Sequence, residues 1–205
     1  MSYYFSENPD VKSKEVTTKA EVCGSLYVFK TDNNVFSKKG LDYGTRILLE
    51  SLNYEEIKGN ILDFGCGYGP IGIVVSSKTN SDVDMVDINL RALLLARKNA
   101  MLNKVSVNIF KSNVYENVDK KYDYIITNPP IRVGKKILYE ILIGAKDYLN
   151  EKGKLIFVIN KDQGAKSAMR DLGEFYNVKI LNKSGGFFII SCEKYWLIEW
   201  IRVKL

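Results

Sequence analysis

The chain has 205 residues, of which 46% are hydrophobic and 26% are charged, and its formal net charge is +6. These values suit one globular domain with a core, and no apolar run reaches the length of a membrane span. The sequence contains no histidine, which excludes histidine bases, histidine-activated nucleophiles and histidine metal sites. The positive charge permits a polyanionic partner without requiring one.

The cysteines and the first residues indicate the compartment. Cys23, Cys66 and Cys192 are too scattered for a zinc site or a disulfide framework. The opening stretch, MSYYFSENPDVKSKE, lacks the apolar centre of a signal peptide. We therefore expect a protein of the reducing cytoplasm that holds no metal.

The first 58 residues differ in pattern from the rest. Two β-prone runs in SLYVFKTDNNVFS flank Asp32, Asn33 and Asn34, which predicts a hairpin that turns there. In LDYGTRILLESL the apolar residues recur near helical spacing. We expect an antiparallel β lead-in and a lid helix over residues 1–58.

From residue 60 onward, short buried strands alternate with helices. Strands are expected at NILDF, SDVDMVDI, VSVNIFKSN, YDYIIT and GKLIFVIN, with two more in the closing stretch NVKILNKSGGFFIISCE. Helices are expected at PIGIVVSSKT, NLRALLLARKNAMLN, residues 134–149 and GAKSAMRDLGEFY. Pro70 suits a first helical turn, and Asn89 suits an N-cap. The alternation predicts an α/β fold with a mostly parallel, seven-stranded sheet and an antiparallel C-terminal strand.

Ligands of such sheets bind at the carboxyl ends of the strands, where the first loop is DFGCGYGPIG. Gly65, Gly67 and Gly69 allow the main chain to bend and to approach a ligand. Asp87 ends the next strand, where a carboxylate can accept both hydroxyls of a ribose. Gly67, Gly69 and Gly72 also fit the dinucleotide pattern G-x-G-x-x-G, so a nicotinamide oxidoreductase is an alternative. Pro70 disfavours this alternative, because it removes a main-chain N–H that a pyrophosphate would need. Another alternative is a turn that needs glycine only for packing.

Together with MVDIN, this loop resembles the first two motifs of class I S-adenosylmethionine-dependent methyltransferases. The resemblance implies a Rossmann-like core over residues 59–194, with the glycine loop beside the methionine part and Asp87 on the ribose. Ser112 and Asn113 match a third motif, in which an acidic residue often contacts the adenine. Because Asn113 replaces that acid, we expect a different adenine contact or an ordinary loop cap.

The strand YDYIIT ends at Asn128, Pro129 and Pro130. Two consecutive prolines fix φ and disfavour helix before each of them, so the main chain is preset. The Asn128 side-chain oxygen and the Pro129 carbonyl can then accept the two hydrogens of an amino group beside a methyl sulfonium. An alkylated amine loses its proton to water, which fits a chain without histidine. A proline pair that merely ends a strand is the alternative.

NPP resembles the fourth motif of amino-methyltransferases that act on adenine, guanine or glutamine, although Ile131 replaces the usual aromatic residue. Six stretches resemble the small-domain ribosomal RNA guanine-N2 methyltransferases, the RsmC-like group: YFSENPDVKSK, VFSKKGLDYGTRILLE, ILDFGCGYGPIG, MVDIN, NVYENV and NPPIRVGK. The resemblance implies that residues 36–45 fold over the methionine end of the cofactor. Many members carry a second, inactive domain, for which this chain has no room, and the tail 195–205 exceeds the usual fold.

The resemblance implies four catalytic residues: Asn128, Pro129, Pro130 and Ile131. It implies that S-adenosylmethionine contacts Ser37, Thr45, Asp63, Gly65, Cys66, Gly67, Gly69, Asp87, Ile88, Asn113, Val114 and Asn128. Lys38, Arg132 and Lys135 are basic residues of the lid and the catalytic loop, and we expect them to contact RNA phosphates.

The leading hypothesis is therefore methylation of a guanine N2 amine in ribosomal RNA or a ribosomal subunit, by a monomer or a weak homodimer. The target base must be unpaired or turned outward. The alternatives are a methyltransferase for a protein glutamine or a DNA adenine, and an RNA-associated module that binds the nucleoside without turnover.

Overall fold

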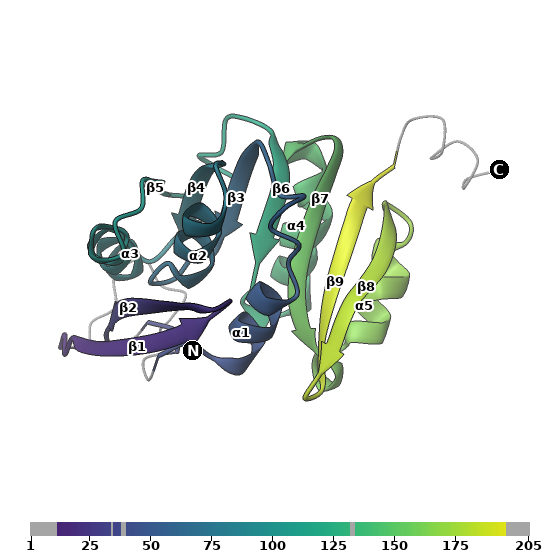
Figure 1. Ribbon diagram of the computed structural model, residues 1–205. Coiled ribbons are helices and arrows are strands. Elements are labelled where there is room, and N and C mark those ends of the chain that lie inside the picture. Colours follow the sequence, from purple (N-terminus) through teal and green to yellow (C-terminus); the bar gives the residue numbers. More distant parts are fainter. Residues whose placement is uncertain (1–11, 34, 38–39, 132–133, 196–205) are drawn as a thin grey trace.

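A seven-stranded sheet is the frame of the molecule (Figure 1). The computed structural model describes residues 12–33, 35–37, 40–131 and 134–195. The strand order is β5-β4-β3-β6-β7-β9-β8, with β9 antiparallel to both neighbours and the other neighbouring pairs parallel. The strands are β3 Asn60–Phe64, β4 Asp82–Asp87, β5 Asn108–Lys111, β6 Tyr122–Thr127, β7 Leu149–Asn160, β8 Tyr176–Ser184 and β9 Phe187–Lys194. This arrangement confirms the predicted α/β fold.

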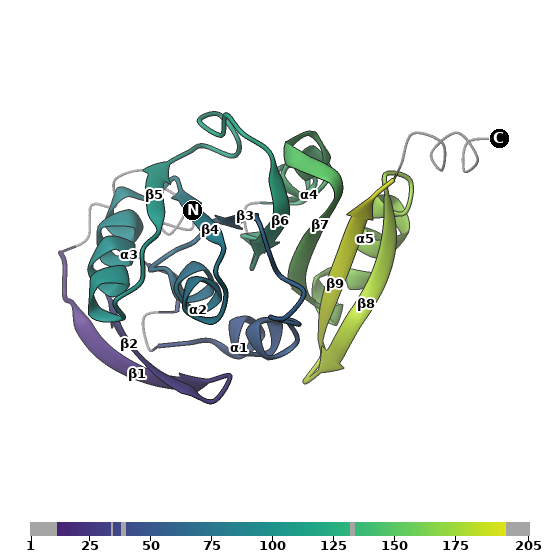
Figure 2. The ribbon, with the colours of Figure 1, turned by 45° about the horizontal axis from the view of Figure 1, so that its top comes forward.

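Helices cover both faces of the sheet (Figure 2). On one face lie α1 (Tyr43–Glu50), α2 (Pro70–Lys78) and α3 (Leu90–Leu102), and on the other lie α4 (Lys135–Tyr148) and α5 (Ala165–Leu172). A short 3-10 turn, η3 (Lys161–Gln163), follows β7. Each layer buries its own apolar cluster against the sheet. No helix in the described ranges is both long and apolar enough to cross a membrane.

Two helix starts follow the predicted chemistry. Pro70 occupies the first turn of α2, where its missing N–H has no helical partner to lose. Asn89 caps α3, and its side-chain oxygen accepts from the N–H groups of Arg91 and Ala92 at 2.9 and 3.1 Å. Such a cap satisfies donors that the first helical turn leaves without intrahelical partners.

The lead-in is a hairpin of β1 (Val16–Val22) and β2 (Ser25–Thr31), but its turn is not where the sequence predicts it. Cys23 and Gly24 form the turn, with positive φ values of 51° and 69°. The predicted placement of the hairpin turn at residues 32–34 is therefore wrong, because β1 and β2 pair across residues 23 and 24. Asp and Asn favour turns in general, whereas a two-residue hairpin turn of this kind needs positive φ at both positions.

Asp32 anchors the chain after β2, where its carbonyl also accepts from the Val35 N–H at 3.3 Å. Its side chain is 2% exposed. It accepts from the Ser13 hydroxyl at 2.6 Å and from the Asn33 N–H at 2.6 Å. The Arg91 Nε lies 3.8 Å from its Oδ2, so the carboxylate also has a partner of opposite charge on α3. These donors hold the pKa of Asp32 below its usual range even though burial opposes them.

Asn99 of α3 and Asn103, the C-cap of that helix, fasten the hairpin to the helix layer. The Asn99 amide accepts from the N–H of Lys30 and donates to its carbonyl, and the Asn103 amide does the same with Val28. These pairs satisfy main-chain groups along the edge of β2. The Asn99 Nδ2 also donates to the Tyr68 carbonyl at 2.8 Å, so the hairpin is tied to the loop after β3.

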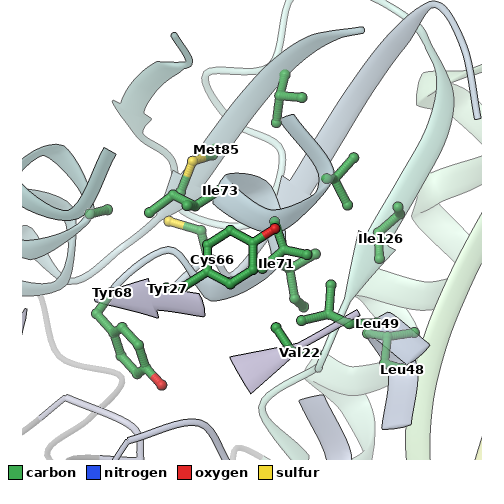
Figure 3. Packing of buried hydrophobic residues seen from close by; sticks show 14 of the residues in the cluster. Val22, Tyr27, Leu48, Leu49, Cys66, Tyr68, Ile71, Ile73, Met85 and Ile126 are labelled. Carbon is green, nitrogen blue, oxygen red and sulfur yellow. The ribbon is translucent and has the colours of Figure 1, made fainter. Parts of the chain in front are cut away.

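The hairpin shares a core with the helices of its face. Figure 3 shows Val22 and Tyr27 of the hairpin close to Leu48 and Leu49 of α1 and Ile71 of α2. The division of the chain after residues 58 and 194 stays a prediction. At the C-terminal end, residues 196–205 of the predicted tail lie outside the described residues.

Candidate active site

The glycine loop after β3 borders open space at its start and packs tightly at its end. Gly65, Gly67 and Gly69 have positive φ values of 69°, 55° and 98°. A Cβ at Gly65 or Gly67 would meet no atom within 4 Å, whereas a Cβ at Gly69 would lie 2.8 Å from Met85 Cε. The packing explanation therefore accounts for Gly69, while the first two glycines leave room for a ligand against the main chain.

Two predicted cofactor residues of this loop have buried side chains. Asp63 is 0% exposed, and its Oδ2 accepts from the Gly72 N–H at 2.7 Å. Burial raises the pKa of Asp63 to about 7. Burial also raises the pKa of the Cys66 thiol well above its usual range. The Cys66 N–H donates to the Val86 carbonyl at 2.8 Å, which joins the ends of β3 and β4. Both residues thus shape the loop from inside, and their contact with a cofactor stays a prediction.

The Asp87 carboxylate lies beside the glycine loop at the end of β4. Its Oδ2 accepts from the Gly67 N–H at 2.9 Å, and its Oδ1 accepts from the Asn89 N–H at 2.8 Å. A carboxylate offers about four acceptor positions, so each oxygen keeps room for a further donor. Asp87 and Ile88 are half-buried, and burial raises the pKa of Asp87. This placement agrees with a ribose contact, which stays a prediction.

The loop after β5 closes tightly on itself next to Asp87. The Ser112 hydroxyl donates to the Val114 carbonyl at 2.8 Å, and the Ser112 N–H donates to the Asp87 carbonyl at 3.1 Å. Val114 has a φ of 49°, which β-branched residues rarely adopt and which concentrates at functional sites. Asn113 is exposed. An adenine contact by Asn113 or Val114 stays a prediction.

The side chain of Asn128 is held through its amide nitrogen. Nδ2 lies 2.9 Å from Thr45 Oγ1 and 3.3 Å from Asp42 Oδ1. Because a carboxylate accepts but does not donate, the nitrogen must be the atom that faces Asp42. Within the described ranges of the chain, no donor bonds to Asn128 Oδ1, and the residue is half-buried. The predicted acceptor oxygen is therefore available.

The two prolines after Asn128 end β6 in a tight turn. Pro129 is buried, and its carbonyl accepts from the Ile131 N–H at 2.9 Å. A carbonyl oxygen has two lone pairs, so one remains for a second donor. Pro130 and Ile131 are half-buried, and Ile131 packs against the core beneath α4. The catalytic roles of these residues stay predictions.

The predicted lid residues lie in or before the first turn of α1. Phe36 is 50% exposed. Ser37 has a φ of 59°, and its hydroxyl donates to a main-chain carbonyl three residues on. Thr45 is 2% exposed, and its hydroxyl faces Asn128 rather than open space. The cofactor contacts of Ser37 and Thr45 stay predictions.

Asp42 is a site residue that the sequence analysis does not select. It is the N-cap of α1, and its Oδ1 accepts from the Thr45 N–H at 3.0 Å. An Asp directly before a helical pattern is a recognisable N-cap. Nothing in that local signal indicates its contact with Asn128, which lies 86 positions away.

Lys135 is the only one of the three predicted RNA-binding residues that belongs to the described residues, since Lys38 and Arg132 lie outside them. Its side chain is 71% exposed. The ammonium lies 3.8 Å from Asp171 Oδ2 and 4.9 Å from the centre of the Tyr139 ring. A surface ion pair of this length is weak, so a phosphate can compete for the lysine. Its RNA contact stays a prediction.

Comparison with known proteins decides the family. The profile of the family described as "Methyltransferase small domain" matches residues 26–191. The chain belongs to this family. Membership confirms the prediction of a methyltransferase with S-adenosylmethionine as its cofactor.

Two relatives place the chain within this methyltransferase family. The uncharacterized protein YbxB of Bacillus subtilis is 40% identical over 197 residues, which are 94% of this chain and 98% of that protein. Ribosomal RNA small subunit methyltransferase C of Psychromonas ingrahamii is 37% identical over 163 residues, which are 77% of this chain and 46% of that enzyme. These matches confirm the predicted relationship to the RsmC-like group. The chain spans less than half the length of that methyltransferase C relative.

A solved structure shows the same fold. The 16S rRNA methyltransferase RsmC of T. thermophilus, in complex with AdoMet and guanosine, superimposes with a TM-score of 0.76 at 24% identity. The match covers 91% of this chain and 52% of that protein. The predicted Rossmann-like methyltransferase fold is thereby confirmed.

Proposed function

We propose that this methyltransferase acts on the exocyclic N2 amine of a guanine in ribosomal RNA, and specifically in that of the small subunit. The motifs shared with the RsmC-like group and the names of the methyltransferase C relatives support this assignment. The observation that carries it is the Asn128 amide. Its nitrogen is engaged by Asp42 and Thr45, which leaves its oxygen as the acceptor for an incoming donor.

The described residues fit the cofactor. S-adenosylmethionine supplies an electrophilic methyl carbon, and the sulfur keeps the electron pair of the S–C bond as the methyl group leaves. Gly65 and Gly67 border open space, so a ligand can lie against their main chain. Asp87 keeps acceptor positions for the ribose hydroxyls beside its bonds to Gly67 and Asn89.

The chain's own contribution is to prepare the amine. The N2 lone pair of guanine is delocalised into the ring, which makes the nitrogen a poor nucleophile. Asn128 Oδ1 and the Pro129 carbonyl each accept one N–H of the amine, which holds the nitrogen in a pyramidal geometry and localises its lone pair. That lone pair forms the new N–C bond, and the alkylated amine releases one proton to water.

The RNA is held around this loop. A guanine must leave its stack to bring N2 to Asn128. Lys135, together with Lys38 and Arg132, contacts the flanking phosphates. Because ribosomal RNA is the proposed substrate, the proposed compartment is the cytoplasm. The proposed oligomeric state, a monomer or a weak homodimer, is a separate proposal.

Transfer of labelled methyl groups to four acceptors tests the proposal. Naked small-subunit RNA, assembled small subunits, DNA and release factors are incubated in parallel, and the product is identified by digestion and mass spectrometry. We expect label in N2-methylguanine from one of the two RNA samples. Label in DNA adenine or protein glutamine would establish an alternative function, and cofactor binding without any transfer would indicate a module that does not turn over.

A further inference from the structure

The first turn of α1 contacts the catalytic loop through two side chains, Asp42 and Thr45. We infer that Asp42 and Thr45 are positioning residues, which lock the Asn128 amide in the one orientation that offers its oxygen to the substrate amine. The inference rests on the proposed function, because it assigns a role within the same site. It differs from a cofactor role for Thr45, which the family resemblance implies.

Both amide hydrogens of Asn128 have an acceptor. One points to Thr45 Oγ1, at 2.9 Å from the nitrogen, and the other to Asp42 Oδ1, at 3.3 Å. A primary amide has two N–H donors, so this pair of acceptors uses the whole donor capacity of the side chain. Only the oxygen is left for a ligand, and a χ2 rotation that exchanged oxygen and nitrogen would break the bond to Asp42.

The two positioning residues contribute different things. A threonine hydroxyl can donate or accept, so Thr45 alone would tolerate an inverted amide with its oxygen toward α1. The Asp42 carboxylate only accepts, so an inverted amide would bring two oxygens together. Asp42 therefore selects the orientation, and Thr45 fixes the position.

The first turn of α1 is itself held in place from the opposite side. The Tyr43 hydroxyl lies 3.0 Å from Ser184 Oγ at the end of β8, and the Tyr43 ring meets the Phe187 ring edge to face, with 5.9 Å between the ring centres. A Cβ at Gly44 would lie 3.1 Å from Phe187 Cε1 and 3.2 Å from Asp42 Oδ1. Because Gly44 has no side chain, the start of α1 can lie close to Phe187 of β9. This position of α1 brings Asp42 and Thr45 to Asn128.

The burial of Thr45 supports positioning rather than cofactor contact. Thr45 is 2% exposed, and its hydroxyl oxygen accepts a hydrogen bond from the Asn128 amide nitrogen. Its main-chain N–H is also engaged, because it donates to Asp42 Oδ1 at 3.0 Å. The hydroxyl keeps its own hydrogen as a donor, so it is the burial of Thr45 that limits access for a ligand.

Steady-state kinetics of matched variants test the inference. Thr45→Val keeps the shape and removes the acceptor, Thr45→Ser restores a hydroxyl, and Asp42→Asn keeps a good N-cap but can face Asn128 with either atom. We expect kcat to fall about 10- to 100-fold in Thr45→Val and Asp42→Asn, as when groups that orient a reactive residue are removed, while the Kd of S-adenosylhomocysteine changes less than about threefold. Thr45→Ser should recover most of kcat. Thr79→Val, which removes a hydroxyl bonded to the Val75 carbonyl at the far end of α2, is the matched control and should retain kcat.

A second measurement does not depend on activity. The side-chain NH2 pair of Asn128 is assigned in a 15N-correlated NMR spectrum by its loss in Asn128→Ala. We expect slow solvent exchange of this pair in the wild type, and a shifted, faster-exchanging pair in Thr45→Val and Asp42→Asn but not in Thr79→Val. An unperturbed pair in both site variants, or a raised Kd for S-adenosylhomocysteine with unchanged kcat, would overturn the inference. A perturbed pair in a protein that methylates none of the four acceptors would support the positioning and refute the proposed function instead.

Discussion

The proposed site has a cofactor half and an amine half, and the two are built in different ways. The cofactor half consists of the glycine loop and Asp87, whose bonds join residues that are close in sequence: Asp63 with Gly72, nine positions apart, and Gly67 with Asp87, twenty positions apart. The amine half joins Asn128 to α1 across more than 80 positions. The first half needs only the pairing of neighbouring strands, whereas the second also needs α1 to pack beside the catalytic loop.

This difference predicts that binding and turnover can be separated by mutation. The cofactor half relies on main-chain shape and one carboxylate, so it can bind a nucleoside even when the amine half is damaged. The amine half relies on three side chains acting as a unit, and the loss of its oxygen should stop methyl transfer without emptying the cofactor site. The predictions below are ordered by the size of the expected effect, and each can break or sharpen this contrast.

The largest effect is expected from Asn128→Ala. Removal of one preorganised acceptor at the reacting group lowers kcat by about 10²- to 10³-fold. S-adenosylhomocysteine should raise the melting temperature of the variant as much as that of the wild type. Turnover and thermal shift are measured on the same preparation. Unchanged turnover would remove Asn128 from catalysis, and a lost thermal shift would show that the two halves are coupled.

A pH-dependent stability is expected in the cofactor half. Burial raises the pKa of Asp63 to about 7 in the folded chain, above its value of about 3.9 when unfolded. Folding therefore takes up a proton between these values. The contribution of the neutral Asp63 side chain to the free energy of unfolding is fully present below about pH 4. It is lost as the pH rises through 7, with a slope of at most about 1.4 kcal/mol per pH unit.

Denaturant unfolding between pH 4 and 8 measures this slope in the wild type and in Asp63→Asn. The amide of the variant does not titrate, so its stability should change less with pH in this window. Asp87, whose pKa burial also raises, is present in both proteins, so the difference between the two curves reports Asp63 together with its repulsion by Asp87. If the free energy of unfolding changes with pH equally in the two proteins, Asp63 is already ionised in the folded chain at the low end of this pH range.

Asp87→Ala should weaken cofactor binding while leaving the amine half intact. Hydrogen bonds to a charged acceptor contribute about 1.5 to 3 kcal/mol, so the Kd of S-adenosylhomocysteine should rise by about 10- to 100-fold. Calorimetry measures this Kd, and the NMR signal of the Asn128 amide should stay in place. NAD should not shift the melting temperature of the wild type, and a shift would revive the oxidoreductase alternative.

The features that could be predicted from the sequence are those that a short stretch specifies. The alternation of strands and helices predicts the layers, and Pro70 and Asn89 mark the starts of α2 and α3 correctly. Glycines with positive φ, followed by an acid at the end of the next strand, predict the sharp loop that bonds to Asp87, while its cofactor contacts stay predictions. In each case the residues concerned interact within one strand-helix-strand unit, so their spacing carries the information.

The features that could not be predicted depend on contacts between distant segments. Cys23 is an unusual turn residue, and its turn competes with a polar stretch that favours turns by composition. Asp42 reads as an N-cap, and its second role exists only because α1 lies beside the end of β6. Asn99 reads as a helix residue, yet it pairs with β2 and the Tyr68 carbonyl. Tertiary packing gives these side chains partners that no local pattern indicates.

The smallest effects are expected from a matched pair of substitutions within the cofactor half, Gly65→Ala and Gly69→Ala. Both positions have positive φ, which costs a residue with a Cβ about 1 to 2 kcal/mol. At Gly65 the new methyl group enters the open space beside the main chain, whereas at Gly69 it lies 2.8 Å from Met85 Cε inside the core. Gly69→Ala should therefore cost about 1 kcal/mol more stability from overpacking, although the flexible end of a methionine can yield.

The same pair should respond in the reverse order when S-adenosylhomocysteine is added. The methyl group at Gly65 occupies the space that a ligand would use, so the Kd should rise more in Gly65→Ala than in Gly69→Ala. Denaturant unfolding measures the order of the two variants in stability, and calorimetry measures their order in the Kd of S-adenosylhomocysteine. If Gly65→Ala binds as the wild type does, the open space beside Gly65 is not where the cofactor lies, and the cofactor half would have to be sought nearer to Asp87. The two variants should rank in opposite orders in stability and in binding only if the loop binds a ligand on one side and packs against the core on the other. Strain that was equal at both glycines would lower stability and binding together.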